Sequence, residues 1–106
     1  MGDYRVAIIG LGGMGGHHAE AVQAEEGCRL VGGAEIDVSR AKDWGARFGV
    51  AEVYDDYQRM LDAVAPDAVI ISTQAPQHHG PTIAAAQRGI HVFCEKPTAL
   101  DLVEAD

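Results

Sequence analysis

Short apolar runs alternate along the whole chain with segments in which apolar residues recur at helical spacing. Five runs are short enough to be buried strands and are bounded by turn-forming residues. They span residues 4–10, 29–35, 50–54, 68–73 and 90–94. The second of these predicted strands is weakened by Gly32 and Gly33, which have no side chains to pack.

The segments between the strands predict helices that end at a glycine or break at a proline. Asp55, with Gln58 three residues later, resembles a capping box that opens the third helix, and Pro66 breaks that helix. Pro81 is expected to mark the start of the fourth helix. The predicted helices cover residues 12–26, 39–48, 56–64, 81–88 and 99–105.

Strands that alternate with helices predict an α/β fold with a parallel, doubly wound sheet of the Rossmann type. All 106 residues fit one domain of five strands. In the strand order 3-2-1-4-5-6 of such sheets, the sixth strand has no counterpart here, and neither has a C-terminal domain. We therefore expect the chain to be truncated after the Glu95-Lys96-Pro97 segment.

Composition and charge exclude several classes of function. The formal net charge of −8 argues against nucleic acid or an anionic membrane as a partner, since both require clustered Lys and Arg. The first apolar run, Val6–Ile9, is too short for a signal sequence or a membrane span. Cys28 and Cys94 are the only cysteines, which favours a reducing, cytoplasmic environment.

A glycine-rich segment follows the first predicted strand and opens the first helix. It matches the dinucleotide-binding pattern G-x-G-x-x-G through Gly10, Leu11, Gly12, Gly13, Met14 and Gly15. Gly10 permits the tight turn, Gly12 lets the backbone approach a pyrophosphate, and Gly15 lets helix and strand pack closely. In a chain with 13 glycines the pattern alone also fits a plain glycine-rich turn. The structural context of the pattern therefore decides between such a turn and a dinucleotide site.

An acidic residue stands where that context requires one. Glu35 ends the second predicted strand, 20 residues after Gly15, and can accept hydrogen bonds from the adenosine ribose. Ile36 and Asp37 supply no positive charge for the 2′-phosphate of NADP, so NAD is favoured as the cofactor. Arg40, on the next helix, leaves NADP open as an alternative.

A second group of residues lies where the fourth and fifth strands end. It comprises the Thr73 to His78 spacing, Gly89 with His91-Val92, and Glu95-Lys96-Pro97. With these positions, and with the glycine motif followed by His18, the chain resembles the glucose–fructose oxidoreductase, inositol dehydrogenase and rhizopine-catabolism family (Gfo/Idh/MocA). The resemblance covers nearly the whole chain.

The resemblance implies an NAD(P)-dependent oxidoreductase that transfers hydride to or from a sugar, polyol or related alcohol. Lys96 matches the family's active-site lysine beside the nicotinamide, and such a cation can polarise the reacting oxygen. Cofactor-binding positions are implied at Ser72, Thr73, His78 and Glu95. Where the family has Thr-Pro after the fourth strand, Thr73 is followed by Gln74, which puts the conformation of that loop in doubt.

Other hypotheses remain at this stage. The chain could be a stand-alone nucleotide-binding or sensing module, or a methyltransferase-like binder of S-adenosylmethionine, although Glu95-Lys96-Pro97 speaks against the latter. No metal site is predicted, because adjacent histidines in a helix, as in His17-His18, diverge by about 100°. The family's substrate domain and its acid–base pair are missing, so we expect little turnover from this chain alone. The exposed fifth strand predicts a homo-oligomer, with a dimer as its simplest form.

Overall fold

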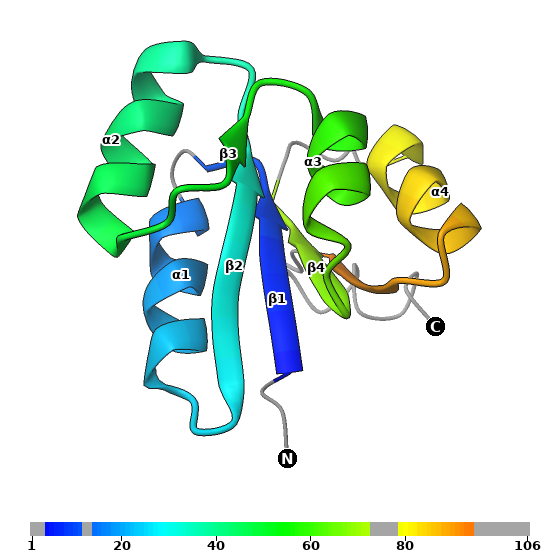
Figure 1. Cartoon of the computed structure of the whole chain (residues 1–106), viewed down its shortest axis with the longest axis horizontal. Coiled ribbons are helices and arrows are strands. Elements are labelled where there is room, and N and C mark those ends of the chain that lie inside the picture. Colours follow the sequence, from blue (N-terminus) through cyan, green and yellow to red (C-terminus); the bar gives the residue numbers. More distant parts are fainter. Residues whose placement is uncertain (1–3, 12–13, 73–78, 95–106) are drawn as a thin grey trace.

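The computed structural model describes residues 4–11, 14–72 and 79–94 of the 106-residue chain. In this part of the chain strands and helices alternate from end to end (Figure 1). The elements are β1 (Tyr4–Ile9), α1 (Met14–Ala24), β2 (Cys28–Ala34), α2 (Val38–Phe48), β3 (Val53–Tyr54), α3 (Tyr57–Val64), β4 (Ala68–Ile71), α4 (His79–Gln87) and β5 (His91–Cys94). The helix predicted at residues 99–105 lies outside the described residues.

The strands form one parallel sheet in the order β3-β2-β1-β4-β5. β1 lies at its centre, and Ile8 of β1 stands beside Ile70 of β4, which stands beside Phe93 of β5. This confirms the predicted fold class and strand order. Within the described residues β5 pairs only with β4, so it forms one edge of the sheet, and Phe93 is 57% exposed there.

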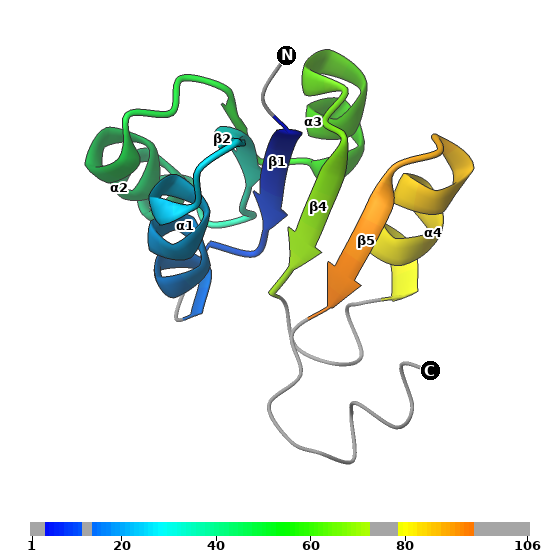
Figure 2. The same ribbon diagram turned by 90° about the horizontal axis from the view of Figure 1, so that it is seen from below.

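The helices cover both faces of the sheet, α1 and α2 on one and α3 and α4 on the other (Figures 1 and 2). The side chains of β1 alternate between the two layers, as they must in a strand. Ile8 packs with Trp44 of α2, whereas Ala7 and Ile9 pack with residues of α3 and α4 such as Met60. No helix among the described residues has the length and apolar character that a membrane span requires.

The two glycines of β2, which were predicted to weaken the strand, lie where side chains of the helices pack closely against the sheet. Both are buried, and each leaves space for a large side chain from a helix. A Cβ on Gly33 would lie 2.8 Å from the ring of Trp44, and a Cβ on Gly32 would lie 3.0 Å from Val64. A β-bulge at Val31, just before the glycines, shifts the pairing of β2 with β1.

Two helix termini follow local signals, and one of these corrects the prediction. α2 ends at Gly49, which has the left-handed φ of 69° that favours glycine. α3 is capped by Asp56, not by Asp55, because it is the Asp56 carboxylate that accepts hydrogen bonds from the N–H groups of Gln58 and Arg59. Asp55 instead forms an exposed ion pair with Arg59.

Two other element boundaries differ from those predicted. β3 is only two residues long, since the Val50 N–H, at the start of the predicted strand, donates to the carbonyl of Gly45 in α2. α4 begins at His79, two residues before Pro81. The missing N–H of Pro81 is tolerated because the first four N–H groups of a helix have no partner within it.

Candidate cofactor site

The carboxyl ends of β1, β2 and β4 meet at one edge of the sheet. The Gly10 N–H donates to the carbonyl oxygen of Ala34 at the end of β2, at 2.8 Å. The Ser72 N–H donates to the carbonyl oxygen of Ile9 at the end of β1, also at 2.8 Å. These bonds bring Gly10, Glu35 and Ser72, three of the residues predicted from sequence, to the edge where open α/β sheets bind their ligands.

The glycine segment has the strand–turn–helix context that its motif requires. Gly10 follows β1 with a φ of 90°, which a residue with a side chain rarely adopts, so it makes the predicted turn. Met14 and Gly15 are the first residues of α1, so the motif leads to a helix N-terminus. Such a terminus carries unpaired N–H groups and the positive end of the helix dipole. Gly12 and Gly13 lie outside the described residues.

The carboxylate of Glu35 ties this segment to the end of β2. Oε1 accepts a hydrogen bond from the Leu11 N–H at 2.9 Å, and Oε2 accepts one from the Asp37 N–H at 3.0 Å. The side chain of Glu35 is 11% exposed. A carboxylate has about four acceptor sites, so both oxygens keep capacity for ribose hydroxyls. Besides the role predicted for it, Glu35 therefore holds the glycine segment in place.

Two charged residues at the start of α2, its N-cap and a residue of its first turn, lie beside Glu35. Asp37 is the N-cap of the helix and accepts a hydrogen bond from the backbone N–H of Arg40. The Arg40 guanidinium lies 3.7 Å from Oε2 of Glu35, and its side chain is 54% exposed. A cation and an anion therefore stand together at the place where the adenosine ribose is expected.

The hydroxyl of Ser72 is a buried polar group at the same edge. Its Oγ is buried and has no hydrogen-bond partner within the described part of the chain. A buried hydroxyl without a partner costs free energy, and a bound polar ligand can supply that partner. This orphaned atom, the turn at Gly10 and the helix N-terminus together fit a dinucleotide.

The cofactor-binding positions Thr73, His78 and Glu95 and the catalytic position Lys96 all lie outside the described residues. They follow β4 or β5 in sequence, or precede α4, and so are connected to elements that end or begin at this edge. Their roles remain predictions.

The residue that packs against the glycine segment was not predicted from the sequence. Trp44 is the only tryptophan of the chain, and it is buried in a cluster with Leu11 and Ile8. A Cβ on Gly33 would touch both the Trp44 ring and Leu11, so these three residues form one packed unit. The apolar positions of α2 could have indicated its buried face, but not its partner in the glycine segment.

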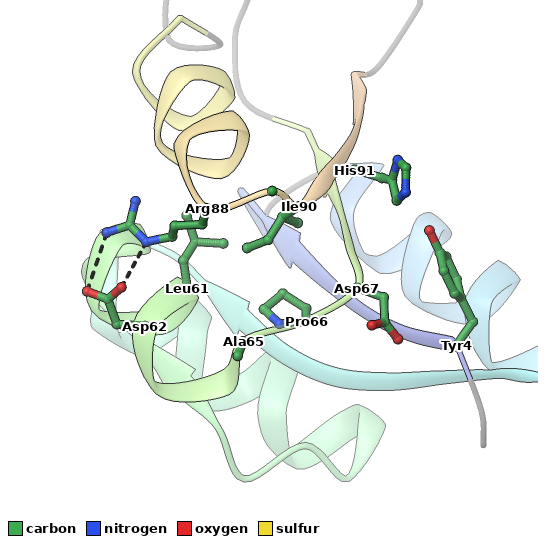
Figure 3. A pocket seen from close by; sticks show the side chains of 10 residues that line it. Tyr4, Leu61, Asp62, Ala65, Pro66, Asp67, Arg88, Ile90 and His91 are labelled. Atoms are coloured by element: carbon green, nitrogen blue, oxygen red, sulfur yellow. Dashed lines mark hydrogen bonds and ion pairs between the residues drawn. The ribbon is translucent and has the colours of Figure 1, made fainter.

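A cavity of about 460 Å³ lies at the opposite, amino-terminal edge of the sheet (Figure 3). Tyr4 at the start of β1, Asp67 before β4 and His91 at the start of β5 line it, together with an ion pair between Asp62 and Arg88. Ligands of open α/β sheets bind outside the carboxyl ends of the strands. This cavity is therefore separate from the cofactor site.

Among the described residues a shifted pKa is resolved for three groups, of which Asp62 and Arg88 line the cavity at the amino-terminal edge and Tyr54 ends β3 at the carboxyl edge. Two hydrogen bonds from the Arg88 guanidinium hold the pKa of Asp62 below its ordinary value, and the same contact raises the pKa of Arg88. The hydrogen bond to Glu52 raises the pKa of the Tyr54 hydroxyl. Each shift follows from a single side-chain partner, Asp62 with Arg88 and Tyr54 with Glu52, and none of these contacts involves a predicted site residue.

Fold and site together define a dinucleotide-binding α/β domain. The family model for an oxidoreductase family with an NAD-binding Rossmann fold matches residues 4–106, and the chain belongs to this Gfo/Idh/MocA family. The family's description confirms the predicted NAD-binding domain and the resemblance drawn from Glu95-Lys96-Pro97 and the glycine motif.

Curated relatives are sugar and polyol dehydrogenases. The chain is 35% identical to D-apiose dehydrogenase of Paraburkholderia graminis over 102 residues, which are 96% of this chain and 27% of that protein. It is 31% identical to myo-inositol 2-dehydrogenase of Thermotoga maritima, again over 96% of this chain and 30% of that protein. The chain thus spans about a third or less of the length of these relatives.

Solved structures agree with the fold. Myo-inositol 2-dehydrogenase from Lactobacillus plantarum superimposes with a TM-score of 0.82 at 35% identity, covering 96% of this chain and 31% of that one. Scyllo-inositol dehydrogenase from Lactobacillus casei, which was crystallised with NAD(H) and scyllo-inositol, gives a TM-score of 0.83 at 28% identity. That alignment covers 90% of this chain and 28% of the other.

Proposed function

We propose that this chain binds NAD(H) for a dehydrogenase that transfers hydride to or from a sugar, polyol or related alcohol. The observation that carries the proposal is the Glu35 carboxylate, which accepts hydrogen bonds from both the glycine segment and the β2–α2 turn. This arrangement places an acidic group at the expected adenosine ribose beside a helix N-terminus. The relatives named for D-apiose and myo-inositol support a small polyhydroxylated substrate.

Each part of the site has a defined task in binding the dinucleotide. The N-terminus of α1 stabilises the pyrophosphate through unpaired N–H groups and its dipole. Glu35 accepts from the ribose hydroxyls, and the Ser72 hydroxyl contributes a buried polar contact further along the edge. When bound, NAD supplies the group that accepts or donates the hydride. We place this chemistry in the cytoplasm, because two cysteines do not form the disulfide-dense pattern of small secreted domains.

The preference for NAD over NADP follows from charge. Glu35 is nearly buried, and a carboxylate near a 2′-phosphate is repelled by it. Ile36, next in sequence and 84% exposed, adds no cation to offset that repulsion. NADH should therefore bind more tightly than NADPH.

Calorimetric titration with NADH, NADPH and S-adenosylmethionine tests the binding function. We expect NADH to bind most tightly and S-adenosylmethionine not to bind. Binding of S-adenosylmethionine without NADH would replace the proposal with the methyltransferase-like alternative.

The catalytic part of the proposal concerns Lys96. We propose that its ammonium group contacts the reacting oxygen and helps the proton leave. Turnover can be followed as NADH formation with myo-inositol, in a chimera that joins this chain to the remaining part of the Thermotoga maritima relative. Lys96→Ala should lower kcat by about 100-fold or more with little change in NADH affinity.

Lys42, exposed on α2, is the only other lysine and provides the matched control. Lys42→Ala should leave kcat unchanged. Equal kcat in the wild-type and Lys96→Ala chimeras would remove Lys96 from the mechanism. NADH binding without turnover in a folded chimera would favour a nucleotide-binding or sensing module.

A further inference from the structure

Leu11 holds the glycine segment at the sheet edge through two different contacts. Its backbone N–H donates to Oε1 of Glu35 at 2.9 Å. Its side chain is 4% exposed and belongs to the core cluster that contains Ile8 and Trp44. Gly12, the predicted position of closest approach to a pyrophosphate, is the next residue in sequence. A displacement of the Leu11 side chain would therefore move the part of the segment that contacts the cofactor.

The indole ring of Trp44 occupies the space that Gly33 leaves open on β2. A Cβ on Gly33 would lie 2.8 Å and 3.0 Å from two atoms of this ring, and 3.2 Å from Cδ1 of Leu11. The ring and the Leu11 side chain therefore converge on the same point of the sheet. Because protein interiors are close-packed and the ring is 4% exposed, its size determines how near Leu11 can come to β2.

The indole N–H indicates that stability alone does not explain a tryptophan at this place. Nε1 of Trp44 is buried and has no hydrogen-bond partner within the described part of the chain. A buried donor without a partner costs free energy. An apolar side chain of similar size would avoid this cost, so the stability of the fold by itself favours such a side chain over tryptophan.

We propose that Trp44 is a positioning residue for dinucleotide binding, whose ring holds Leu11, and with it the glycine segment, in the conformation that the cofactor requires. This inference rests on the proposed function, since it concerns the same cofactor. A segment that is ordered before binding gives a higher affinity, because less conformational entropy is lost when the ligand binds. Glu35 restrains the segment by a hydrogen bond, and Trp44 restrains it by packing.

The test is calorimetric titration of NADH into the wild-type chain, Trp44→Leu and Met60→Ala, each checked for folding by circular dichroism. Met60 is the matched control, because it is fully buried in the core cluster on the other face of the sheet, in which no described residue of the glycine segment takes part. Both substitutions remove a large buried side chain and lower stability. We expect Trp44→Leu to weaken NADH binding about tenfold and Met60→Ala to leave Kd within about twofold of wild type.

Rescue by a second substitution separates positioning from a general loss of stability. In the Trp44→Leu background, Gly33→Ala places a methyl group in the space that the ring has left. We expect the double variant to bind NADH about threefold or more tightly than Trp44→Leu. In the wild-type background the same Gly33→Ala substitution displaces the ring and should weaken NADH binding. A purely structural role for Trp44 predicts no such reversal.

Hydrogen exchange of the Leu11 amide reports the restraint directly, because this N–H donates to Glu35. The amide of Ser72, which donates to the carbonyl of Ile9 at the same edge, is the reference. Trp44→Leu should accelerate exchange at Leu11 about tenfold more than at Ser72. Met60→Ala should change the ratio of the two rates by less than about twofold.

An unchanged Kd for NADH in folded Trp44→Leu would overturn the inference while leaving the proposed function intact. Weaker binding without rescue by Gly33→Ala, or equal acceleration of both amides, would overturn it as well. Should Trp44→Leu not fold, Trp44→Phe serves as the second variant: binding weakened about threefold supports the inference, and an unchanged Kd overturns it. A folded wild-type chain that does not bind NADH would overturn both proposals.

Discussion

Replacing Gly33 by alanine tests whether β2 supports the glycine segment through Trp44. The added Cβ would lie 2.8 Å and 3.0 Å from two atoms of the Trp44 ring and 3.2 Å from Cδ1 of Leu11. Contacts below 3.0 Å are not tolerated, so the indole ring must move. Trp44 is 4% exposed and belongs to the same core cluster as Leu11, so its movement also disturbs the packing of the side chains in that cluster.

The size of the effect follows from two opposing contributions. Overpacking a core by one methyl group costs about 1–3 kcal/mol. Replacing glycine by alanine within a strand returns about 0.5–1 kcal/mol, because alanine loses less backbone entropy on folding. We therefore expect Gly33→Ala to lower the free energy of unfolding by about 1–2 kcal/mol, which corresponds to a fall in Tm of about 5–10 °C.

Thermal unfolding followed by circular dichroism measures this change. Gly16→Ala is the matched control: Gly16 lies within α1, and its Cβ would meet Arg47 at an ordinary contact distance of 3.4 Å. That substitution should raise stability by up to about 1 kcal/mol. The reasoning is refuted if Gly33→Ala unfolds at or above the wild-type Tm. It is also refuted if Gly33→Ala costs as much in a Trp44→Leu background as in the wild type.

Three further predictions concern the caps, the surface charges and the sheet edge. Asp56→Ala should destabilise the chain by about 1 kcal/mol through loss of the α3 cap, whereas Asp55→Ala should change its stability by less than about 0.5 kcal/mol, as measured by urea unfolding. Arg88 lowers the pKa of Asp62 in the folded state. The stabilisation that this ion pair gives is therefore present above the ordinary carboxyl pKa of 3.8, and it is lost as the pH falls through the lower folded-state pKa. The free energy of unfolding of Asp62→Asn should therefore be lower than that of the wild type at neutral pH and equal to it in acid. A constant difference between the two proteins across the pH range would exclude this dependence. Light scattering over a concentration series should show self-association through the β5 edge and its loss in Val92→Lys, whereas a strict monomer at high concentration would rule that interface out.

Much of the fold was predictable because its signals are local. The alternation of apolar runs and helical spacing indicated a parallel, doubly wound sheet, and the strand order β3-β2-β1-β4-β5 agrees with it. Gly10 was assigned to a tight turn, and the helix predicted at residues 39–48 was expected to end at a glycine; Gly10 and Gly49 both have a positive φ. In each case the necessary information lies within a few residues of the position.

The errors arose where the outcome depends on residues distant in sequence or on helix register. Gly32 and Gly33 weaken a strand in isolation, but here Val64 and Trp44 occupy the space that they leave. Asp55 and Asp56 are adjacent and equally suited to cap a helix, and only the position of the first turn decides between them.

The candidate site was predictable in part for the same reason. The spacing of the glycine motif and Glu35 indicated one edge of the sheet, and the structure brings Gly10, Glu35 and Ser72 together there. The double anchoring of Glu35 and its pairing with Arg40 could not be predicted, because both depend on how the Leu11 N–H and α2 are oriented in three dimensions.

The central claim is that the Gly10–Gly15 segment binds a nicotinamide dinucleotide. Titration of NADH into the wild-type chain, Gly12→Val and Gly16→Ala, with circular dichroism on each sample, tests it most directly. The account predicts that the wild type and Gly16→Ala bind NADH with similar Kd, while folded Gly12→Val does not bind, because the valine side chain occupies space that the pyrophosphate needs. A folded Gly12→Val variant with the same Kd for NADH as the wild type would contradict it.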